Sequence, residues 1–374
     1  MNEPRSSHRA WIEVDHAAIR DNLAAIRTMA PDTEVIGVVK ANAYGHGDVE
    51  VARTLVGQGV ERLGVATVDE GLALRAAGIG VPILVLWGVG SSEAAAVAAS
   101  GLEPIVDDER TVALLEATAG EGRIGVHLKV DTGLGRQGAA PSDALDLAAA
   151  IVRSRRLHLA GTMSHLAVPG EDEAYTEVQL LRLARLLDGM RAAGIDPGLV
   201  HVSATGALLA GTSPLAGAIR PGLGLYGLVP AWAAGRGREL RPALALKARP
   251  LRLFDLAAGE AIGYGLRYRT PRATRIATLG IGYGDGWPRS HANNGSVLVR
   301  GRRASVVGAI SMDGLTVDIG EIAGVTYDDE FVLIGEQGGS RITVDEVADE
   351  RRTINYEVTT ALRRRLPRLH LGAD

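Results

Sequence analysis

The chain contains 374 residues, of which 46% are hydrophobic, and it carries a formal net charge of −4. This length predicts two domains, and the slight acidity excludes a surface built for nucleic acid or for an anionic membrane. Because the chain has no cysteine, disulfides, thiol nucleophiles and thiolate-bound metals are excluded, and we expect a cytoplasmic protein without a metal site.

The first predicted elements are a helix and a strand. Residues 15–30 predict a helix because Ile19, Leu23 and Ile26 recur on one face. The apolar run 35–39 follows, and its short length and β-branched side chains favour a strand that is buried in a parallel sheet. The chain therefore begins as an α/β fold.

The same alternation continues through the first two thirds of the chain. The clearest later helix covers residues 173–190, where leucines and a methionine share one side. The predicted strands cover residues 35–39, 63–66, 83–87, 103–106, 124–130, 157–163, 200–203 and 218–225. Eight such units predict a TIM-type (β/α)8 barrel as the domain 1–242, and a doubly wound sheet is the alternative.

The pattern changes after residue 242, because long helical patterns become rare. Extended runs bounded by Gly, Asp and Asn turns predict strands at residues 275–282, 296–299, 304–310, 315–319 and 331–334. We therefore expect a separate β-rich domain over residues 243–374.

Lysine is scarce in this chain, which draws attention to the few that remain. Of 40 lysine and arginine residues, only Lys40, Lys129 and Lys247 are lysines. Surface charge accepts either residue, whereas a Schiff base needs an amine that can lose its proton. Reacting groups of barrels gather at the carboxyl ends of the strands, which makes Lys40 and Lys129 candidates for an active-site rim. A single lysine taken at random would more often be plain surface charge.

A glycine-rich stretch, residues 220–224, follows the seventh predicted unit. Barrels often bind phosphate in this region, because backbone N–H groups can approach an anion where no Cβ intervenes. Alone, the stretch is equally typical of a plain turn. Together with a rim lysine it indicates a phosphorylated cofactor that reacts with amines, namely pyridoxal 5'-phosphate (PLP).

The segment 38–47, VVKANAYGHG, resembles the cofactor-attachment signature of the alanine racemase family. Further blocks that resemble this family lie, in order, at residues 127–136, 220–222, 262–265, 282–287, 311–313 and 355–357. The resemblance therefore covers nearly the whole chain. It implies a (β/α)8 barrel followed by a β domain.

The resemblance also implies a role for each matching residue. Lys40 would form a Schiff base with PLP and exchange a proton with one face of the substrate Cα, and Tyr264 would serve the opposite face. Lys129 would be carbamylated and would orient Arg136. The cofactor would be held by Lys40, Tyr44, Arg136, His165, Thr205, Arg220, Gly222, Leu223 and Tyr356. The substrate would contact Arg136, Tyr283, Met312 and Asp313.

The activity implied by the resemblance is the interconversion of L- and D-alanine, which supplies D-alanine for peptidoglycan, in a homodimer with shared active sites. A racemase for serine, lysine or a broader set of amino acids stays open, because one methylene changes discrimination by only about 1–3 kcal/mol. More distant alternatives are a PLP-dependent amino-acid decarboxylase, which uses a cysteine, and a PLP-carrier protein, which resembles the barrel alone.

Two positions depart from the pattern of the family. The phosphate segment usually resembles Asn-Ser, whereas this chain has Ala204 and Thr205, so that a hydroxyl is kept and a side-chain amide is lost. The residue after Asp313 is Gly314, where relatives often have glutamine. These departures concern the phosphate and substrate contacts and leave the two proton-transfer residues in place.

Overall fold

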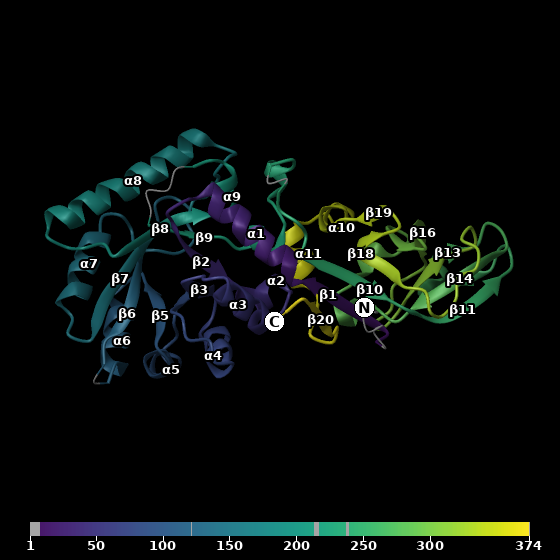
Figure 1. Cartoon of the computed structure of the whole chain (residues 1–374), viewed down its shortest axis with the longest axis horizontal. Helices are drawn as coiled ribbons and strands as arrows, with labels where there is room; N and C mark the ends of the chain where they lie inside the picture. The colour runs from purple at the N-terminus through teal and green to yellow at the C-terminus, as the bar shows by residue number, and fades with distance from the viewer. Residues whose placement is uncertain (1–7, 121, 213–216, 237–238, 374) are drawn as a thin grey trace. The chain divides into compact units, whose positions relative to one another are not determined.

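The computed structural model describes residues 8–120, 122–212, 217–236 and 239–373. These residues form two compact units (Figure 1). The first, the barrel unit, runs from Ala18 to Pro242, and the second, the β unit, combines the stretch that ends at Ala17 with Ala243–Ala373.

The barrel unit is built around a closed barrel of parallel strands, which confirms the predicted (β/α)8 fold. Its strands, in order around the barrel, are β2 (Glu34–Val38), β3 (Arg62–Val65), β4 (Ile83–Val85), β5 (Leu102–Val106), β6 (Ile124–Lys129), β7 (Leu157–Met163), β8 (Leu199–Ala204) and β9 (Ala218–Arg220). The last strand is shorter than predicted. Pro221 follows it directly and has no N–H for the ladder, and the chain turns into the 3-10 helix η1 (Leu223–Tyr226).

Helices alternate with these strands along the chain. They are α1 (His16–Met29), α2 (Lys40–Tyr44), α3 (Asp48–Gly57), α4 (Val68–Ala76), α5 (Ala94–Ser100), α6 (Glu109–Thr118), α7 (Ala144–Arg153), α8 (Glu173–Ala192), α9 (Thr205–Leu209) and the 3-10 helix η2 (Ala231–Ala233). Across the part of the chain that the structure describes, no helix combines the length and apolarity that a membrane crossing requires.

Part of the barrel interior is apolar. Ile36, Leu84, Ile105, Met163 and Ala218, which come from five different strands, form one buried cluster. Branched and long aliphatic side chains are the usual filling of such barrels, which suits a sequence with only 4% aromatic residues.

The β unit contains one large sheet with the strand order β11-β14-β17-β16-β15-β18-β10-β1-β20, and β19 pairs with β18. Its strands are β1 (Ala10–Asp15), β10 (Leu244–Ala248), β11 (Pro250–Leu256), β14 (Thr274–Leu279), β15 (Ser296–Val299), β16 (Arg302–Val307), β17 (Leu315–Asp318), β18 (Phe331–Gln337), β19 (Ser340–Ile342) and β20 (Arg368–Leu371). A separate small sheet pairs β12 (Ala261–Ile262) with β13 (Tyr268–Arg269). Short helices complete the unit: η3 (Tyr264–Leu266), η4 (Tyr283–Asp285), η5 (Arg289–His291), α10 (Val344–Arg351) and α11 (Asn355–Thr360).

The strand β1 belongs to the β unit, although the sequence-based domain boundaries assign it to the barrel domain. The sequence placed residues 1–242 in the barrel domain, whereas β1 pairs with β10 in antiparallel orientation and with β20 in parallel orientation. Ile12 thus faces Leu246 on one side and Arg368 on the other. Backbone pairing over such a separation depends on the tertiary fold, and no local sequence signal reports it.

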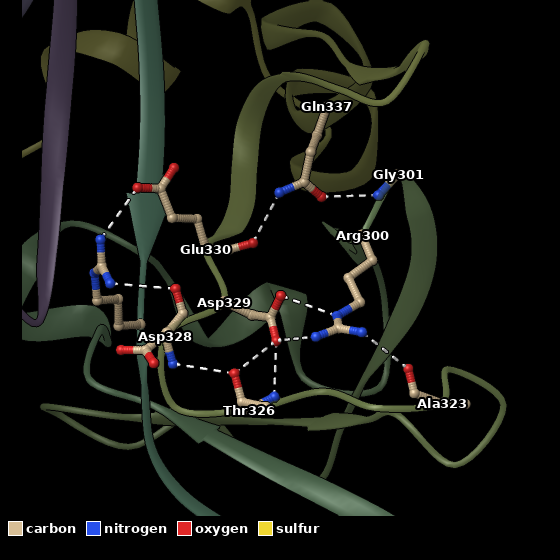
Figure 2. Close-up of polar contacts among 9 residues, drawn as sticks. Arg300, Gly301, Ala323, Thr326, Asp328, Asp329, Glu330 and Gln337 are labelled. Atoms are coloured by element: carbon tan, nitrogen blue, oxygen red, sulfur yellow. Dashed lines mark hydrogen bonds and ion pairs between the residues drawn. The ribbon is translucent and has the colours of Figure 1, made fainter. Parts of the chain in front are cut away.

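The turn between β15 and β16 contacts the segment just before β18 and the last residue of β18 (Figure 2). Arg300 has a positive φ of 52° and donates from Nε and Nη2 to the two carboxylate oxygens of Asp329 at 2.9 and 3.0 Å. Gln337 accepts from the N–H of Gly301 at 3.0 Å and donates to the carbonyl of Glu330 at 2.9 Å. A bidentate ion pair of this kind stabilises a backbone conformation that a non-glycine residue rarely adopts.

Candidate active site

Lys40 follows β2 after a single intervening residue, Val39, at the carboxyl end of the barrel, and begins an unusual turn. The next four residues, Ala41 to Tyr44, all have φ between 52° and 56°, which is the left-handed region. This conformation costs about 1–2 kcal/mol per non-glycine residue, and such strain is concentrated at functional sites. The turn therefore sets the position of Lys40 against an intrinsic preference of the backbone.

Glu70 holds this strained turn from the neighbouring βα unit. Its Oε1 accepts from the backbone N–H of Ala41 at 2.7 Å, and its Oε2 accepts from the N–H of Ala66 at 2.7 Å. Glu70 also completes a capping box with Thr67 at the start of α4, so its position is fixed by its own helix. The first turn of α4 thus anchors the backbone beside Lys40.

The surroundings of Lys40 favour its neutral amine. Burial lowers the pKa of Lys40 most, and the positive charges of Arg136 and Arg220 lower it further, whereas Glu70 acts in the opposite direction. A free amine is what nucleophilic attack on an aldehyde and proton abstraction both require. The structure therefore gives Lys40 the environment of a reactive lysine.

Backbone and hydroxyl groups form a tight cradle at the start of η1. The N–H groups of Gly222 and Gly224 both point at Thr205 Oγ1, at 3.2 and 3.1 Å. A Cβ on Gly222 would lie only 2.5 Å from the hydroxyl of Tyr44, so only glycine allows this approach. Thr205 Oγ1 accepts from both glycines, so its own proton is directed to another acceptor, and the hydroxyls of Thr205 and Tyr44 are both carried by buried residues. This donor set fits a phosphate.

Arg220, at the end of β9, is buried and forms hydrogen bonds in several directions. Its Nη1 lies 2.6 Å from His201 Nδ1, and its Nη2 donates to the Ser164 carbonyl at 2.7 Å and to His165 Nδ1 at 3.2 Å. Burial lowers the pKa of Arg220 to about 9, so it is still a cation at neutral pH. Since guanidinium can only donate, both histidine nitrogens must accept.

His165 is consequently a neutral imidazole with its proton on Nε2. Burial and then the charges of Arg220 and Arg136 lower the pKa of His165 to about 3. With Nδ1 accepting from Arg220, the ring keeps Nε2–H as a donor toward any anionic neighbour.

Lys129 lies at the end of β6 and is buried beside Trp87 and Gln137. Its Nζ donates to Gln137 Oε1 at 2.9 Å and lies 5.6 Å from the centre of the Trp87 ring. The guanidinium of Arg136 lies over the same ring at 5.3 Å. Burial and the charge of Arg136 lower the pKa of Lys129 to about 8. Lys129 and Arg136 are therefore neighbours, and a fraction of Lys129 is a free amine at neutral pH.

The loop that carries Arg136 is shaped by Asp131. Its Oδ1 accepts from the N–H groups of Gly133 and Leu134 at 2.9 and 2.8 Å, and its Oδ2 accepts from Gly135 at 2.9 Å. Gly133 and Gly135 have φ of 139° and 71°, which the absence of a Cβ permits. The sequence DTGLG thus builds the turn that leads to Arg136.

The other candidate residues lie in the β unit, most of them on its surface. Tyr264, on η3 between two glycines of positive φ, is 75% exposed, and Met312 is 52% exposed. Tyr283 begins η4 and is also exposed, and Asp313 accepts from Arg365 Nη2 at 2.6 Å. Tyr356, on α11, is half-buried, and burial raises its pKa. The phenol of Tyr264 is thus on the surface of the β unit.

Local sequence patterns do not reveal several polar neighbours of the site. They are Glu70, Trp87, His127, Gln137, His201 and Arg365, which contact candidate residues or each other. The only local signal is that His127 and His201 stand in runs that otherwise read as buried strands. Their partners come from other strands, so the contacts depend on closure of the barrel.

A (β/α)8 barrel that carries a lysine of lowered pKa and a glycine-dependent cradle at its carboxyl rim, in one chain with a β domain, is typical of a two-domain class of barrel enzymes. The alanine racemase N-terminal domain model matches residues 14–230, and the alanine racemase C-terminal domain model matches residues 243–370. The chain belongs to the alanine racemase family, whose members are isomerases and are generally PLP-dependent.

Individual relatives agree with this assignment over nearly their full length. The alanine racemase of Symbiobacterium thermophilum is 40% identical over 97% of both chains, and that of Halothermothrix orenii is 38% identical over 98% of both. The crystal structure of alanine racemase from Bacillus anthracis with bound L-Ala-P superposes with a TM-score of 0.93 at 32% identity, covering 99% of this chain and 97% of that one.

Proposed function

We propose that the chain interconverts L- and D-alanine, with PLP attached at Lys40 and with Lys40 and Tyr264 as the two proton-transfer groups. The observation that carries this proposal is the neutral-favouring environment of Lys40 on the same rim as the cradle of Gly222, Thr205 and Tyr44. An amine for the aldehyde and donors for the phosphate are the two features that PLP requires.

The cofactor supplies an electron sink that makes the Cα–H of a bound amino acid acidic. The residues of the chain then have to remove a proton from one face of Cα and deliver one to the other. A single base would have to cross the plane of the substrate or exchange with water. Two groups, Lys40 on one face and Tyr264 on the other, avoid both problems.

His165 supports the phenol in this scheme. Tyrosine ordinarily titrates near ~10, so a phenolate at neutral pH needs a donor or a cation beside it. His165 is neutral and keeps its Nε2–H free to donate, because its Nδ1 accepts from Arg220. We infer that His165 hydrogen-bonds to Tyr264 in the assembled site.

The arginines serve the substrate and the cofactor differently. Arg136 would bind the substrate carboxylate and the phenolic oxygen of PLP, and carbamylation of Lys129 would place an anion beside it. Arg220 would face the ring nitrogen of PLP, and a cation there disfavours protonation of that nitrogen. An unprotonated ring nitrogen withdraws electrons less strongly, and this would discourage side reactions such as transamination.

The remaining contacts concern the phosphate and the substrate. Tyr44, Thr205, Gly222, Leu223 and Tyr356 would hold the phosphate, and Tyr283, Met312 and Asp313 would line the approach of the amino acid. Asp313 would lie toward the substrate carboxylate, and its ion pair with Arg365 reduces the repulsion between the two anions.

The exposure of Tyr264 supports a homodimer with shared sites. A phenol that transfers a proton to Cα has to be shielded from water, whereas Tyr264 is 75% exposed in the single chain. We propose that the β unit of one subunit supplies Tyr264 to the barrel of its partner. Location in the cytoplasm and a role in supplying D-alanine for peptidoglycan stay predictions.

Two experiments test the chemistry. The purified protein should show a visible absorbance band that disappears on borohydride reduction, with the reduced cofactor on the peptide that contains Lys40. The variant Tyr264→Phe should lose activity strongly and unequally in the two directions, while Tyr327→Phe, which alters another exposed tyrosine of the same unit, should not. A PLP carrier would be indifferent to Tyr264→Phe.

Two further experiments test the assembly and the substrate. Mixing inactive Lys40→Ala and Tyr264→Phe subunits should restore some activity if sites are shared, and no recovery after subunit exchange contradicts sharing. Racemisation rates for alanine, serine and lysine should be highest for alanine, and a clear preference for serine or lysine overturns the proposed substrate.

A further inference from the structure

A column of polar side chains crosses the interior of the barrel below Arg220. His201 Nε2 lies 2.9 Å from His127 Nδ1, and His127 Nε2 lies 3.2 Å from Glu103 Oε2. Glu103 in turn accepts from Arg62 Nη1 at 2.8 Å. These residues connect Arg220, at the carboxyl end of β9, with Glu103 and Arg62, near the amino ends of β5 and β3.

The two histidines are completely buried, while Glu103 reaches the edge of the core with 17% of its side chain exposed. Barrel interiors are ordinarily filled by branched apolar residues, and a buried polar group is costly unless each of its hydrogen bonds is made. A column of this kind is therefore stable only if every donor meets an acceptor along its whole length.

Space for the column is provided by Gly161 on β7. A Cβ at this position would lie 2.5 Å from His127 Nδ1 and 2.5 Å from the carbonyl oxygen of Leu199. The imidazole of His127 thus occupies space that the side chain of any residue other than glycine at position 161 would fill.

The two ends of the column fix the direction of its hydrogen bonds. Arg220 can only donate, so His201 Nδ1 must accept and its proton must be on Nε2. His201 Nε2–H then donates to His127 Nδ1, which leaves the proton of His127 on Nε2, facing Glu103. A carboxylate can only accept, so Glu103 supplies the matching end.

Charges along the column agree with this direction. Burial would raise the pKa of Glu103, but the hydrogen bonds from His127 and Arg62 outweigh it and keep this pKa below its ordinary value. Burial lowers the pKa of both His127 and His201, although Glu103 opposes this for His127. From Glu103 to Arg220 the column thus contains an anion, two neutral rings and a cation, and Arg62 adds a second cation beyond Glu103.

We propose that Glu103 is a positioning residue for the reaction, because it fixes both histidine tautomers and thereby the hydrogen bond that holds Arg220 toward the cofactor ring. Only the claim about Arg220 and the cofactor rests on the proposed function. The claim about the histidine tautomers does not, since they can be measured without any substrate. Without an acceptor at position 103, His127 has two options. It either keeps a buried Nε2–H without an acceptor or moves the proton to Nδ1, where it faces the Nε2–H of His201. Either state weakens the hydrogen bond between His201 Nδ1 and Arg220.

NMR of the histidine ring nitrogens in the holoenzyme, labelled with 15N at histidine only, tests the claim about the tautomers. The nine histidines can be assigned with single His→Asn variants, and protonated and unprotonated nitrogens differ in shift. We expect His127 and His201 each to carry one proton, on Nε2. A proton on Nδ1 of either ring overturns the proposal, whatever the enzyme racemises.

Two variants test the claim that Glu103 acts on the reaction through Arg220. Glu103→Gln keeps an acceptor oxygen without the charge and should preserve both tautomers and most of kcat. Glu103→Leu removes the acceptor and should abolish the single Nε2–H state of His127 and lower kcat about tenfold or more, with a smaller change in KM.

Unchanged tautomers together with an unchanged kcat in Glu103→Leu overturn the proposal. Should Glu103→Leu not fold, the wild-type and Glu103→Gln spectra decide it. If the tautomers are as expected but the protein does not racemise alanine, the proposed function fails and the assignment of the column stands.

Discussion

Replacing Gly222 by alanine is expected to damage the phosphate cradle by crowding. The added Cβ would lie 2.5 Å from the hydroxyl oxygen of Tyr44, 2.9 Å from its Cζ and 3.2 Å from its Cε2, well inside ordinary contact. The Tyr44 ring is buried and packs on Tyr226 with ring centres 5.1 Å apart, so it has little room to retreat. The φ of Gly222 is −119°, so the effect comes from contact and not from the backbone conformation.

The size of the effect follows from the costs of overpacking. Forcing an extra methyl group into a filled site costs about 1–3 kcal/mol. For a unit of this size each kcal/mol lowers Tm by about 2–4 °C, so a fall of about 2–12 °C is expected. Displacement of the Tyr44 hydroxyl should also weaken PLP binding about tenfold, because the hydrogen bond that we propose from Tyr44 to the charged phosphate would be lost.

Thermal unfolding followed by circular dichroism and a fluorescence titration with PLP measure the two effects. Gly57→Ala is the matched control, because a Cβ at the end of α3 meets no heavy atom within 4 Å. It should leave Tm unchanged or slightly raised and PLP affinity unaltered. If Gly222→Ala behaves like this control in both assays, Tyr44 does not limit the space at position 222.

Three further changes are expected to have measurable outcomes. Gly161→Ala should lower the free energy of unfolding in urea by about 1–3 kcal/mol, since its Cβ would overlap His127, and a neutral result contradicts the packing described for the column. Because the pKa of Lys129 is about 8, the neutral amine that reacts with CO2 increases as pH rises through that value, so a carbamate signal in 13C NMR with labelled bicarbonate should grow with pH and be missing in Lys129→Arg. Burial would raise the pKa of Asp329, but Arg300 and Thr326 lower it, so its carboxylate stabilises the fold at neutral pH and this contribution is lost as pH falls through the lowered pKa. Asp329→Asn should therefore cost about 1 kcal/mol at neutral pH and make stability less dependent on pH on the acid side, and an unchanged pH dependence counts against the ion pair in Figure 2.

The sequence predicted the parts of this protein that local patterns encode. Short continuous apolar runs, separated by helical faces at period 3.6, placed the eight barrel strands, and the end of each strand then placed Lys40, Lys129 and Arg220 on one rim. The end of the last strand was placed too late, because residues 221–225 remain apolar while proline and glycine turn the backbone away.

Lysine scarcity and the glycine-rich stretch indicated an amine-reactive phosphorylated cofactor from composition and spacing alone, because Schiff-base and phosphate chemistry restrict which residues can serve. Only the tertiary structure decided the partners of β1, the left-handed turn from Ala41 to Tyr44 and the direction of the hydrogen bonds from Glu103 to Arg220. Each of these depends on groups that are far apart in the chain and meet only after the sheets close, so no window of neighbouring residues contains the interaction that determines it.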